Sequence, residues 1–271
     1  MARNGLKLIL AAVLLALAAA PASAGDGRQS DASGAGQGTG ASGWEFQATL
    51  YLWATALNGS VGIRNLPAAK VDASFSDILE DLNGAAMAAI LARNGDWMIL
   101  ADLVYADLQD SVQLNVANSP TLKFEQSLLV ASAVAGYRLP LGTPDLDLSL
   151  TAGLRYQRLS AKTTLSSGTY PLSVRSDKTR QWLDPIVGLA LQYEIGDRWF
   201  LNGLADIGVF GVGSQLTAQG FLAAGYRWND RLSTAVGYRA LYTDYESGSG
   251  TSRFDYEATM HGPYMSLGVR F

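Results

Sequence analysis

The sequence predicts an all-β protein, a transmembrane antiparallel up-and-down β-barrel of about ten strands, with eight or twelve strands as alternatives. Three observations predict this fold class. Apolar residues recur at every second position in long segments after Trp44, tight turns alternate with longer polar loops, and aromatic residues gather at the segment ends. Because successive side chains of a strand point to opposite faces, the alternation indicates strands with one apolar and one polar face.

Composition narrows the classes of function. The 271 residues are 48% hydrophobic and only 16% charged, with 29 Gly, one His and no Cys. Without Cys there is no disulfide, thiolate zinc site or iron–sulfur cluster, and His261 alone cannot build an imidazole metal site. No metal and no cofactor are therefore expected. The formal net charge of -4 argues against nucleic acid as a partner. A chain this apolar is either unusually well buried or faces lipid.

The N-terminus predicts export. Two basic residues precede an apolar run at 8–20, and small residues at 21–24 fit a signal peptidase. The run is shorter than the about 20 apolar residues of a spanning helix, so 1–24 is predicted to be a cleavable signal peptide. Residues 25–43, rich in Gly and Ser, predict a flexible tether. The barrel is expected over 44–271, in the bacterial outer membrane.

Ten segments carry the strand pattern. In one of them the even positions from Leu146 to Tyr156 are apolar, while the odd positions from Asp147 to Gln157 are polar or Gly. Most segments exceed the about 9–11 residues that a tilted strand needs to cross a bilayer. The predicted strands are 44–57, 83–94, 96–109, 121–139, 145–160, 180–195, 197–211, 215–228, 231–245 and 258–271.

The connections are of two kinds. Tight turns fall at 94–95, 142–144, 196–197 and 229–230, and long polar loops at 58–82, 161–179 and 246–257. Short turns at one rim and long loops at the other are typical of outer-membrane barrels. An even number of strands then brings both ends of the barrel to the short-turn rim.

Aromatic residues predict two interfacial belts. Those near the short turns are Trp44, Trp97, Trp199, Trp228, Tyr137, Tyr193 and Tyr226, and those toward the opposite rim are Tyr105, Tyr156, Trp182, Tyr242 and Tyr245.

The segment 58–82 allows three interpretations. Asn58-Gly59 is a hairpin-type dipeptide, and 76–82 resembles one or two helical turns. The segment is an external loop with a small hairpin and helix, or two further strands that make twelve, or a helix that plugs the lumen. Ten strands are favoured.

A Gly-x-Arg pattern recurs in five of the predicted strands. Gly and Arg share one face, and the apolar residue between them takes the lipid-facing phase, so the arginines are expected to point inward. A charge facing lipid at mid-depth would cost about 2–4 kcal/mol. The predicted lumen-lining residues are Arg138, Arg155, Arg227, Arg239 and Arg270, with Asp102, Asp147, Asp184, Glu194 and Asp206. They form either ion pairs that fill a narrow lumen, with Gly giving room for the Arg side chains, or a charged constriction that selects small anions.

An enzyme is not expected, although an outer-rim hydrolase is an alternative. The ten-stranded omptin proteases act at that rim with a His–Asp pair and further carboxylates, and such a mechanism would have to use His261. Its phase matches the lipid-facing residues of the last strand, and no nucleophile motif surrounds it. A second alternative is an adhesin or binding role for loops 161–179 and 246–257.

The C-terminus predicts an assembly signal. Phe271 ends the chain, and Met265, Leu267 and Val269 precede it at alternate positions. This arrangement resembles the signature that the bacterial barrel-assembly machinery recognises. That machinery, outer-membrane lipids and lipopolysaccharide are the expected partners.

Longer motifs occur at 51–53 (YLW), 71–79 (VDASFSDIL), 182–188 (WLDPIVG), 206–214 (DIGVFGVGS) and 237–239 (GYR). With these motifs, residues 44–271 resemble a family of bacterial outer-membrane β-barrel proteins with no assigned activity. The family typically has two Gly after the Asp of the fourth motif and one intervening residue, where this chain has Ile207-Gly208-Val209. The resemblance implies the fold and the location and carries over no catalytic residue. The expected function is a structural barrel or a narrow channel for small solutes or ions.

Overall fold

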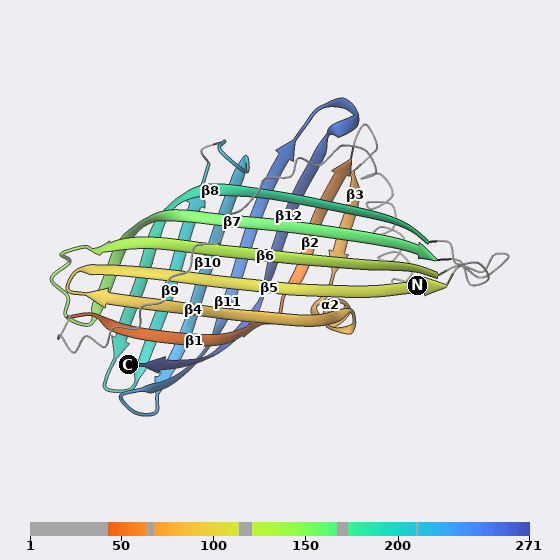
Figure 1. Cartoon of the computed structure of the whole chain (residues 1–271). Coiled ribbons are helices and arrows are strands. Elements are labelled where there is room, and N and C mark those ends of the chain that lie inside the picture. The colour runs from red at the N-terminus through yellow and green to blue at the C-terminus, as the bar shows by residue number, and fades with distance from the viewer. Residues whose placement is uncertain (1–42, 64–67, 114–120, 167–172, 210) are drawn as a thin grey trace, which may run out of the picture.

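A computed structural model describes residues 43–63, 68–113, 121–166, 173–209 and 211–271. They form a closed antiparallel β-barrel of ten strands with two additional strands, which confirms the predicted fold class (Figure 1). The barrel strands are β1 (Glu45–Trp53), β4 (Leu82–Asn94), β5 (Trp97–Gln113), β6 (Thr121–Arg138), β7 (Leu146–Ser166), β8 (Ser173–Ile195), β9 (Trp199–Gly208), β10 (Leu216–Arg227), β11 (Leu232–Ser247) and β12 (Phe254–Arg270). Pairing of β1 with β12 closes the barrel. The expected signal peptide, and the expected tether except Gly43, lie outside the described residues.

A hairpin and a short helix follow β1, as in the first interpretation of 58–82, and the hairpin joins the sheet as two further strands, as in the second. The hairpin consists of β2 (Ala56–Ile63) and β3 (Ala69–Ala73), and α2 (Phe75–Glu80) comes next. β2 continues the line of β1, so that β1 pairs with the C-terminal half of β12 and β2 with its N-terminal half. A capping box between Ser74 and Asp77 starts α2. Within the described ranges, no helix is long and apolar enough to cross a membrane.

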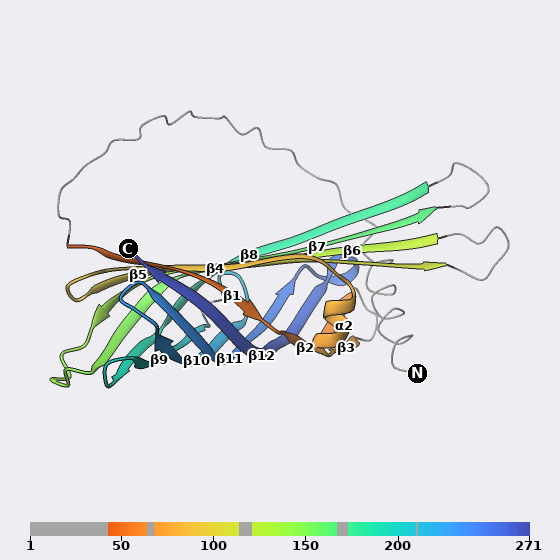
Figure 2. The same cartoon turned by 90° about the horizontal axis from the view of Figure 1, so that it is seen from below.

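Strands β5–β8 project beyond the rest of the wall on the side opposite the short turns (Figure 2). β7 and β8 have 21 and 23 residues, against 10 in β9 and 12 in β10. Two predicted loops are therefore wrong in extent: β7 and β8 take up most of 161–179, and β11 and β12 shorten 246–257 to 248–253. The outer parts of β7 and β8 are polar on both faces, so the alternation that marks a strand disappears there.

The outward face of the wall carries an apolar band of limited height. Leu150 and Leu154 on β7 and Leu183 on β8 are exposed. Farther toward the loops the outward side chains are polar, as at Arg158, which follows the outward Tyr156 on β7, and at Gln181 on β8. Such a band is what the hydrocarbon region of a membrane requires of a barrel.

Aromatic pairs border this band at the short-turn end. Trp97 packs on Tyr137 and Trp199 on Tyr226, each with ring centroids 5.1 Å apart. At the opposite end, the expected belt positions of Trp182 and Tyr245 are wrong, because both side chains lie on the inner face. The side chain of Trp182 is buried there, where it stacks on Tyr245 at 4.2 Å and packs against Phe254 and Tyr256.

Candidate functional site

Two ion pairs lie buried in the interior of the barrel. In the first, Arg155 on β7 donates from Nη2 to both carboxylate oxygens of Asp206 on β9, at 2.8 and 2.9 Å. Its Nη1 donates to Thr217 Oγ1 at 3.0 Å. The side chains of Arg155 and Asp206 are 0% and 2% exposed, so this pair is removed from solvent.

The second pair joins β11 to β5. Arg239 donates from Nη2 to Asp102 Oδ1 at 2.7 Å and from Nη1 to the Tyr51 hydroxyl at 2.8 Å. Tyr51 in turn donates to Asp102 Oδ2 at 2.6 Å. The Arg239 guanidinium also lies 4.9 Å from the ring centroid of Trp53. The planar cation is thus held both by its edge and by its face.

Gln219 joins the two ion pairs into one assembly, which we call the central network. Its Oε1 accepts from Arg239 Nη2 at 2.8 Å, and its Nε2 donates to Asp206 Oδ2 at 3.3 Å. The network comprises Tyr51, Asp102, Arg155, Asp206, Gln219 and Arg239.

The central network crosses the lumen. On the shorter way round the barrel, β4, β1 and β12 separate β5 from β11, yet Arg239 and Asp102 meet in the interior. Gln157 on β7 adds a second crossing by donating to Thr243 Oγ1 on β11 at 3.1 Å. Burial of a charge is costly unless it is paired and hydrogen-bonded, and both pairs meet this condition. The arrangement can tie opposite walls together and obstruct the lumen.

A charged cavity of about 590 Å³, which we call the vestibule, lies at the short-turn end. Arg93 and Arg138 both donate to Asp147 Oδ2, at 3.0 and 2.8 Å. Arg227 pairs with Glu194 through both terminal nitrogens. Arg270 lines the vestibule, and within the described part of the chain it has no carboxylate at ion-pair distance.

The structure brings eight of the ten predicted lumen residues into these ion pairs: Arg138, Arg155, Arg227, Arg239, Asp102, Asp147, Glu194 and Asp206. A ninth predicted residue, Arg270, also lies in the lumen, where it lines the vestibule. Asp184 is also buried, but it accepts from the backbone N–H and the hydroxyl of Ser214, at 2.6 and 2.8 Å, and is not ion-paired in the described ranges.

The glycines of the Gly-x-Arg pattern do not simply make room for arginine. A Cβ added at Gly225 would lie 2.1 Å from the ring of Phe200, and the Arg227 guanidinium stacks on that ring at 4.9 Å. A Cβ at Gly153 would lie 2.0 Å from the backbone oxygen of Ala133 on the neighbouring strand. The expectation that these glycines give room for the Arg side chains is therefore wrong. They are required because an aromatic ring or a neighbouring strand lies too close for a side chain.

Sequence reasoning missed several members of these clusters. Arg93 was missed because it is not part of a Gly-x-Arg pattern, although its position on β4 places it on the inward face. Tyr51, Gln157 and Gln219 are neutral, and a search for charged residues passes over them. Their inward phase was the available signal.

His261 lies on the outward face of β12 with both ring nitrogens hydrogen-bonded. Tyr238 Oη is 2.6 Å from Nδ1, and Asn58 Oδ1 is 2.8 Å from Nε2. Since Asn58 uses its amide nitrogen to donate to Asp72 at 2.7 Å, its oxygen faces the imidazole. In the neutral tautomer that fits these contacts, Nε2 donates to Asn58 and Nδ1 accepts from Tyr238. This arrangement favours a structural role over general base catalysis.

The residues of the predicted assembly signal face outward. Met265, Leu267, Val269 and Phe271 are all exposed, and the ring of Phe271 stacks on Phe46 at 6.0 Å. No cluster of three or more potential His, Asp or Glu metal ligands occurs among the described residues.

Comparison with known proteins supports the fold. The outer membrane protease OmpT from Escherichia coli matches 84% of this chain and 97% of its own, with a TM-score of 0.55 and 12% identity. The translocator domain of NalP from Neisseria meningitidis covers 86% of this chain and 90% of its own (TM-score 0.42, 15% identity). Ail from Yersinia pestis covers 84% and 99% (TM-score 0.32, 11% identity).

No family model and no curated protein sequence matches the chain. The family resemblance of the five motifs thus stays a prediction. The likeness to OmpT shows the fold, which is that of bacterial outer-membrane β-barrels.

Proposed function

We propose that the chain is an integral protein of the bacterial outer membrane and that the central network keeps its lumen closed. The barrel is then a structural membrane element in its resting state, and not an open channel. The observation that carries the proposal is the near-complete burial of the Arg155–Asp206 pair inside the barrel, at 0% and 2% side-chain exposure.

The membrane location is supported by the apolar band, by the aromatic pairs at its border, and by the predicted signal peptide. In this proposal, outer-membrane lipids and lipopolysaccharide contact the band, and the barrel-assembly machinery recognises the strand that ends at Phe271. A barrel of ten strands also leaves little open cross-section, because side chains fill most of a narrow interior.

Conductance in planar lipid bilayers tests the closed lumen. We expect no steady conductance from the wild-type protein. The double variant Arg155→Ala/Asp206→Ala removes both charges together, so no unpaired charge stays buried, and it should conduct. Arg158→Ala is the matched control, because Arg158 lies on the same strand and faces outward. A steady, ion-selective current through the wild type would overturn the proposal and favour a narrow channel.

A further inference from the structure

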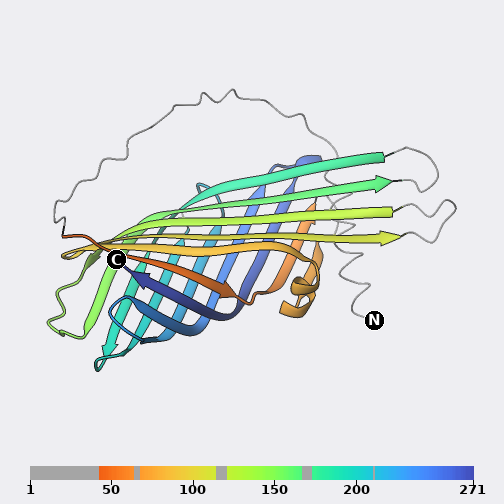
Figure 3. The same ribbon diagram turned by 60° about the horizontal axis from the view of Figure 1, so that its bottom comes forward.

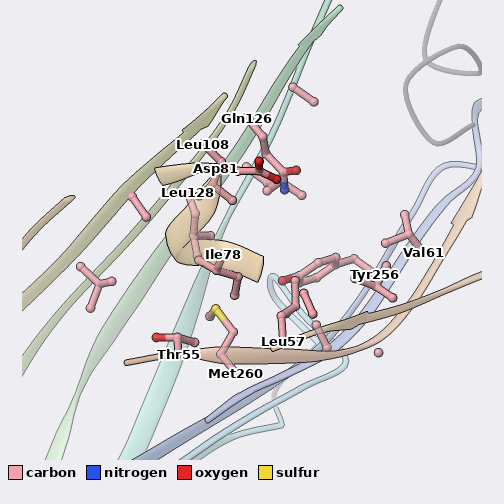
Figure 4. Close-up of a pocket in the computed structure, with 18 of the residues that line it drawn as sticks. Thr55, Leu57, Val61, Ile78, Asp81, Leu108, Gln126, Leu128, Tyr256 and Met260 are labelled. Atoms are coloured by element: carbon pink, nitrogen blue, oxygen red, sulfur yellow. The ribbon is translucent and has the colours of Figure 1, made fainter. Parts of the chain in front are cut away.

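An apolar cavity of about 210 Å³ lies in the loop-side half of the barrel, above the central network. Ile78 of α2 points into it, toward Leu57, Tyr256 and Met260 (Figure 4). Leu128 on β6 completes the apolar lining on the other side. An apolar cavity of about 150 Å³ stays free of water and holds a molecule of the size of benzene. This cavity therefore suits an aromatic ring or a short alkyl chain better than it suits water.

Beside the cavity, the helix α2 takes the place of a wall strand between β3 and β4, and we call this part of the wall the opening. Residues 82–87 of β4 pair with β5, but the pairing of β4 with β1 begins only at Ala88. β3 pairs with β2 alone in the described ranges. Figure 3 shows α2 between β3 and β4. Ala85 of β4 lines the cavity and is nevertheless exposed.

This opening lies at the edge of the apolar band. Ala86, next to the opening, pairs with Tyr105, an exposed tyrosine at the loop-side border. On α2 itself, Phe75 and Leu79 are exposed. In a membrane these two side chains would meet the region where acyl chains give way to head groups. A molecule from the outer leaflet would reach the cavity past a helix of six residues.

Two cations line the same cavity, both on the inner face of β8. Arg180 stacks over the ring of Phe254 at 5.5 Å, which leaves the edge of its guanidinium available, and its buried Nε has no hydrogen-bond partner within the described ranges. Among the described residues, no carboxylate lies at ion-pair distance from Lys178 or Arg180. Three carboxylates also line the cavity, at Asp77, Asp81 and Glu257. Asp77 accepts hydrogen bonds from Ser74, and Glu257 accepts one from Tyr242. Asp81 lies beside Gln126 (Figure 4).

From this arrangement we propose that the cavity binds a single-chain amphiphile with an anionic head group. The alkyl chain occupies the apolar space, the head group lies at Lys178 and Arg180, and the molecule enters from the membrane between β3 and β4. This inference goes beyond the proposed function and rests only on its membrane location. It does not require the lumen to be closed, so a conducting barrel would leave it standing.

Isothermal titration of the full-length protein in nanodiscs of zwitterionic phospholipid tests the site, with empty nanodiscs as the blank. Decanoate should bind saturably with one site per barrel. Decanol and decyltrimethylammonium have similar chains without the negative charge and should bind at least about tenfold more weakly. Lysophosphatidylglycerol is titrated separately, because the same chemistry can come from a free fatty acid or from a membrane lipid. Binding of either anion supports the proposal, and their relative affinities distinguish the two sources.

Variants locate the site. Lys178→Gln/Arg180→Gln should weaken decanoate binding about tenfold and remove the preference over decanol. Ala106→Trp, and independently Ala161→Phe, would fill the cavity and abolish binding. Arg158→Gln on the outward face of β7 is the matched charge control and should bind as the wild type does. Heat-dependent migration on gels confirms that each variant is folded.

Three results would overturn the proposal. If the wild-type protein shows no saturable binding, the cavity takes no amphiphile of this class. Unchanged binding in both folded filling variants would place the ligand elsewhere. Equal binding of decanoate and decyltrimethylammonium would refute the role of the two cations.

Discussion

At the scale of single residues, the interior of this barrel depends on the pairing of a few buried charges. Arg239 uses both terminal nitrogens, on Asp102, Tyr51 and Gln219. Such a pair adds little net stability compared with apolar residues of the same volume, but loss of one partner leaves a buried charge without compensation. The network therefore makes the barrel sensitive to single substitutions and tolerant of paired ones.

Arg239→Ala should lower the free energy of unfolding by about 3–5 kcal/mol, because Asp102 is left buried beside Tyr51. Urea unfolding in lipid vesicles measures the change. The double variant Arg239→Met/Asp102→Leu should regain most of the loss, since it removes both charges. If Arg239→Ala is as stable as the wild type, the central network does not hold the barrel together.

The projecting strands should respond to acid. Hydrogen bonds from Lys162 and Lys123 hold the pKa of Glu125 at about 2, below its usual value of 4.5. A carboxylate with a lowered pKa in the folded state stabilises that state above pH 4.5, and the contribution is lost as the pH falls toward 2. The side chains of Glu125, Lys162 and Lys123 are partly exposed, at 25%, 31% and 40%, so solvent screens the pairs and the effect should be below about 1 kcal/mol.

Hydrogen exchange at the outer ends of β6 and β7, corrected for the intrinsic rate, would detect this loss between pH 5 and pH 2 as an increase in local opening. In Glu125→Gln the opening should not change over that pH interval. An equal acid response in both proteins would assign it to other groups.

At the scale of elements, the last strand has an unusual position. β12 pairs with β11 along its whole length, and on its other edge it pairs with β1 and then with β2. Phe271 extends this pairing by exchanging backbone hydrogen bonds with Phe46. The end of the chain is therefore part of the closure of the barrel.

Deletion of Phe271 should lower the yield of assembled barrel in the outer membrane, because it removes the stacking on Phe46 and the last backbone pair. The heat-modifiable fraction in isolated membranes measures this yield. Val212→Ser is a suitable control, since Val212 is equally exposed and apolar but lies far from the C-terminus. An unchanged yield would count against an assembly signal.

At the scale of the whole molecule, closure makes the structure resistant to detergent. Every barrel strand is hydrogen-bonded to a neighbour on each side over at least part of its length, and the pairing of β1 with β12 closes the ring. The native protein should therefore migrate differently on detergent gels before and after boiling. Equal migration, together with recovery from the soluble periplasm, would refute the membrane placement.

The sequence predicted most of the barrel, because lipid on one side and packed side chains on the other impose a period of two. The prediction of 121–139 as a strand agrees closely with β6 (Thr121–Arg138). Beyond the apolar band the contrast between the two faces is weak, so the sequence pattern indicates a loop at 161–179, where the structure has the outer ends of β7 and β8.

The interior was predicted in part. Phase alone indicated the charged residues that meet inside, but it could not say which residues would pair across the lumen. Asp102 and Arg239 are distant in sequence and lie on strands that are not neighbours. The apolar cavity was not predicted at all, because it depends on the divergence of β1 from β4 near Leu50, where the local sequence gives no signal.

The unequal lengths of the strands divide the barrel into a thick side and a thin seam. β1 has nine residues, whereas β7 and β8 run side by side over more than twice that length. The seam also joins the first and last strands, the most distant parts of the barrel in sequence, and pairing of distant segments carries the largest entropic penalty. During biogenesis we therefore expect strand pairing to start at the central strands and to proceed toward both ends of the chain. The sheet would stay open and curved in the lipid until β1 pairs with β12. In the finished barrel, the backbone amides of the β1–β12 pairing should be the first to exchange their hydrogen with solvent.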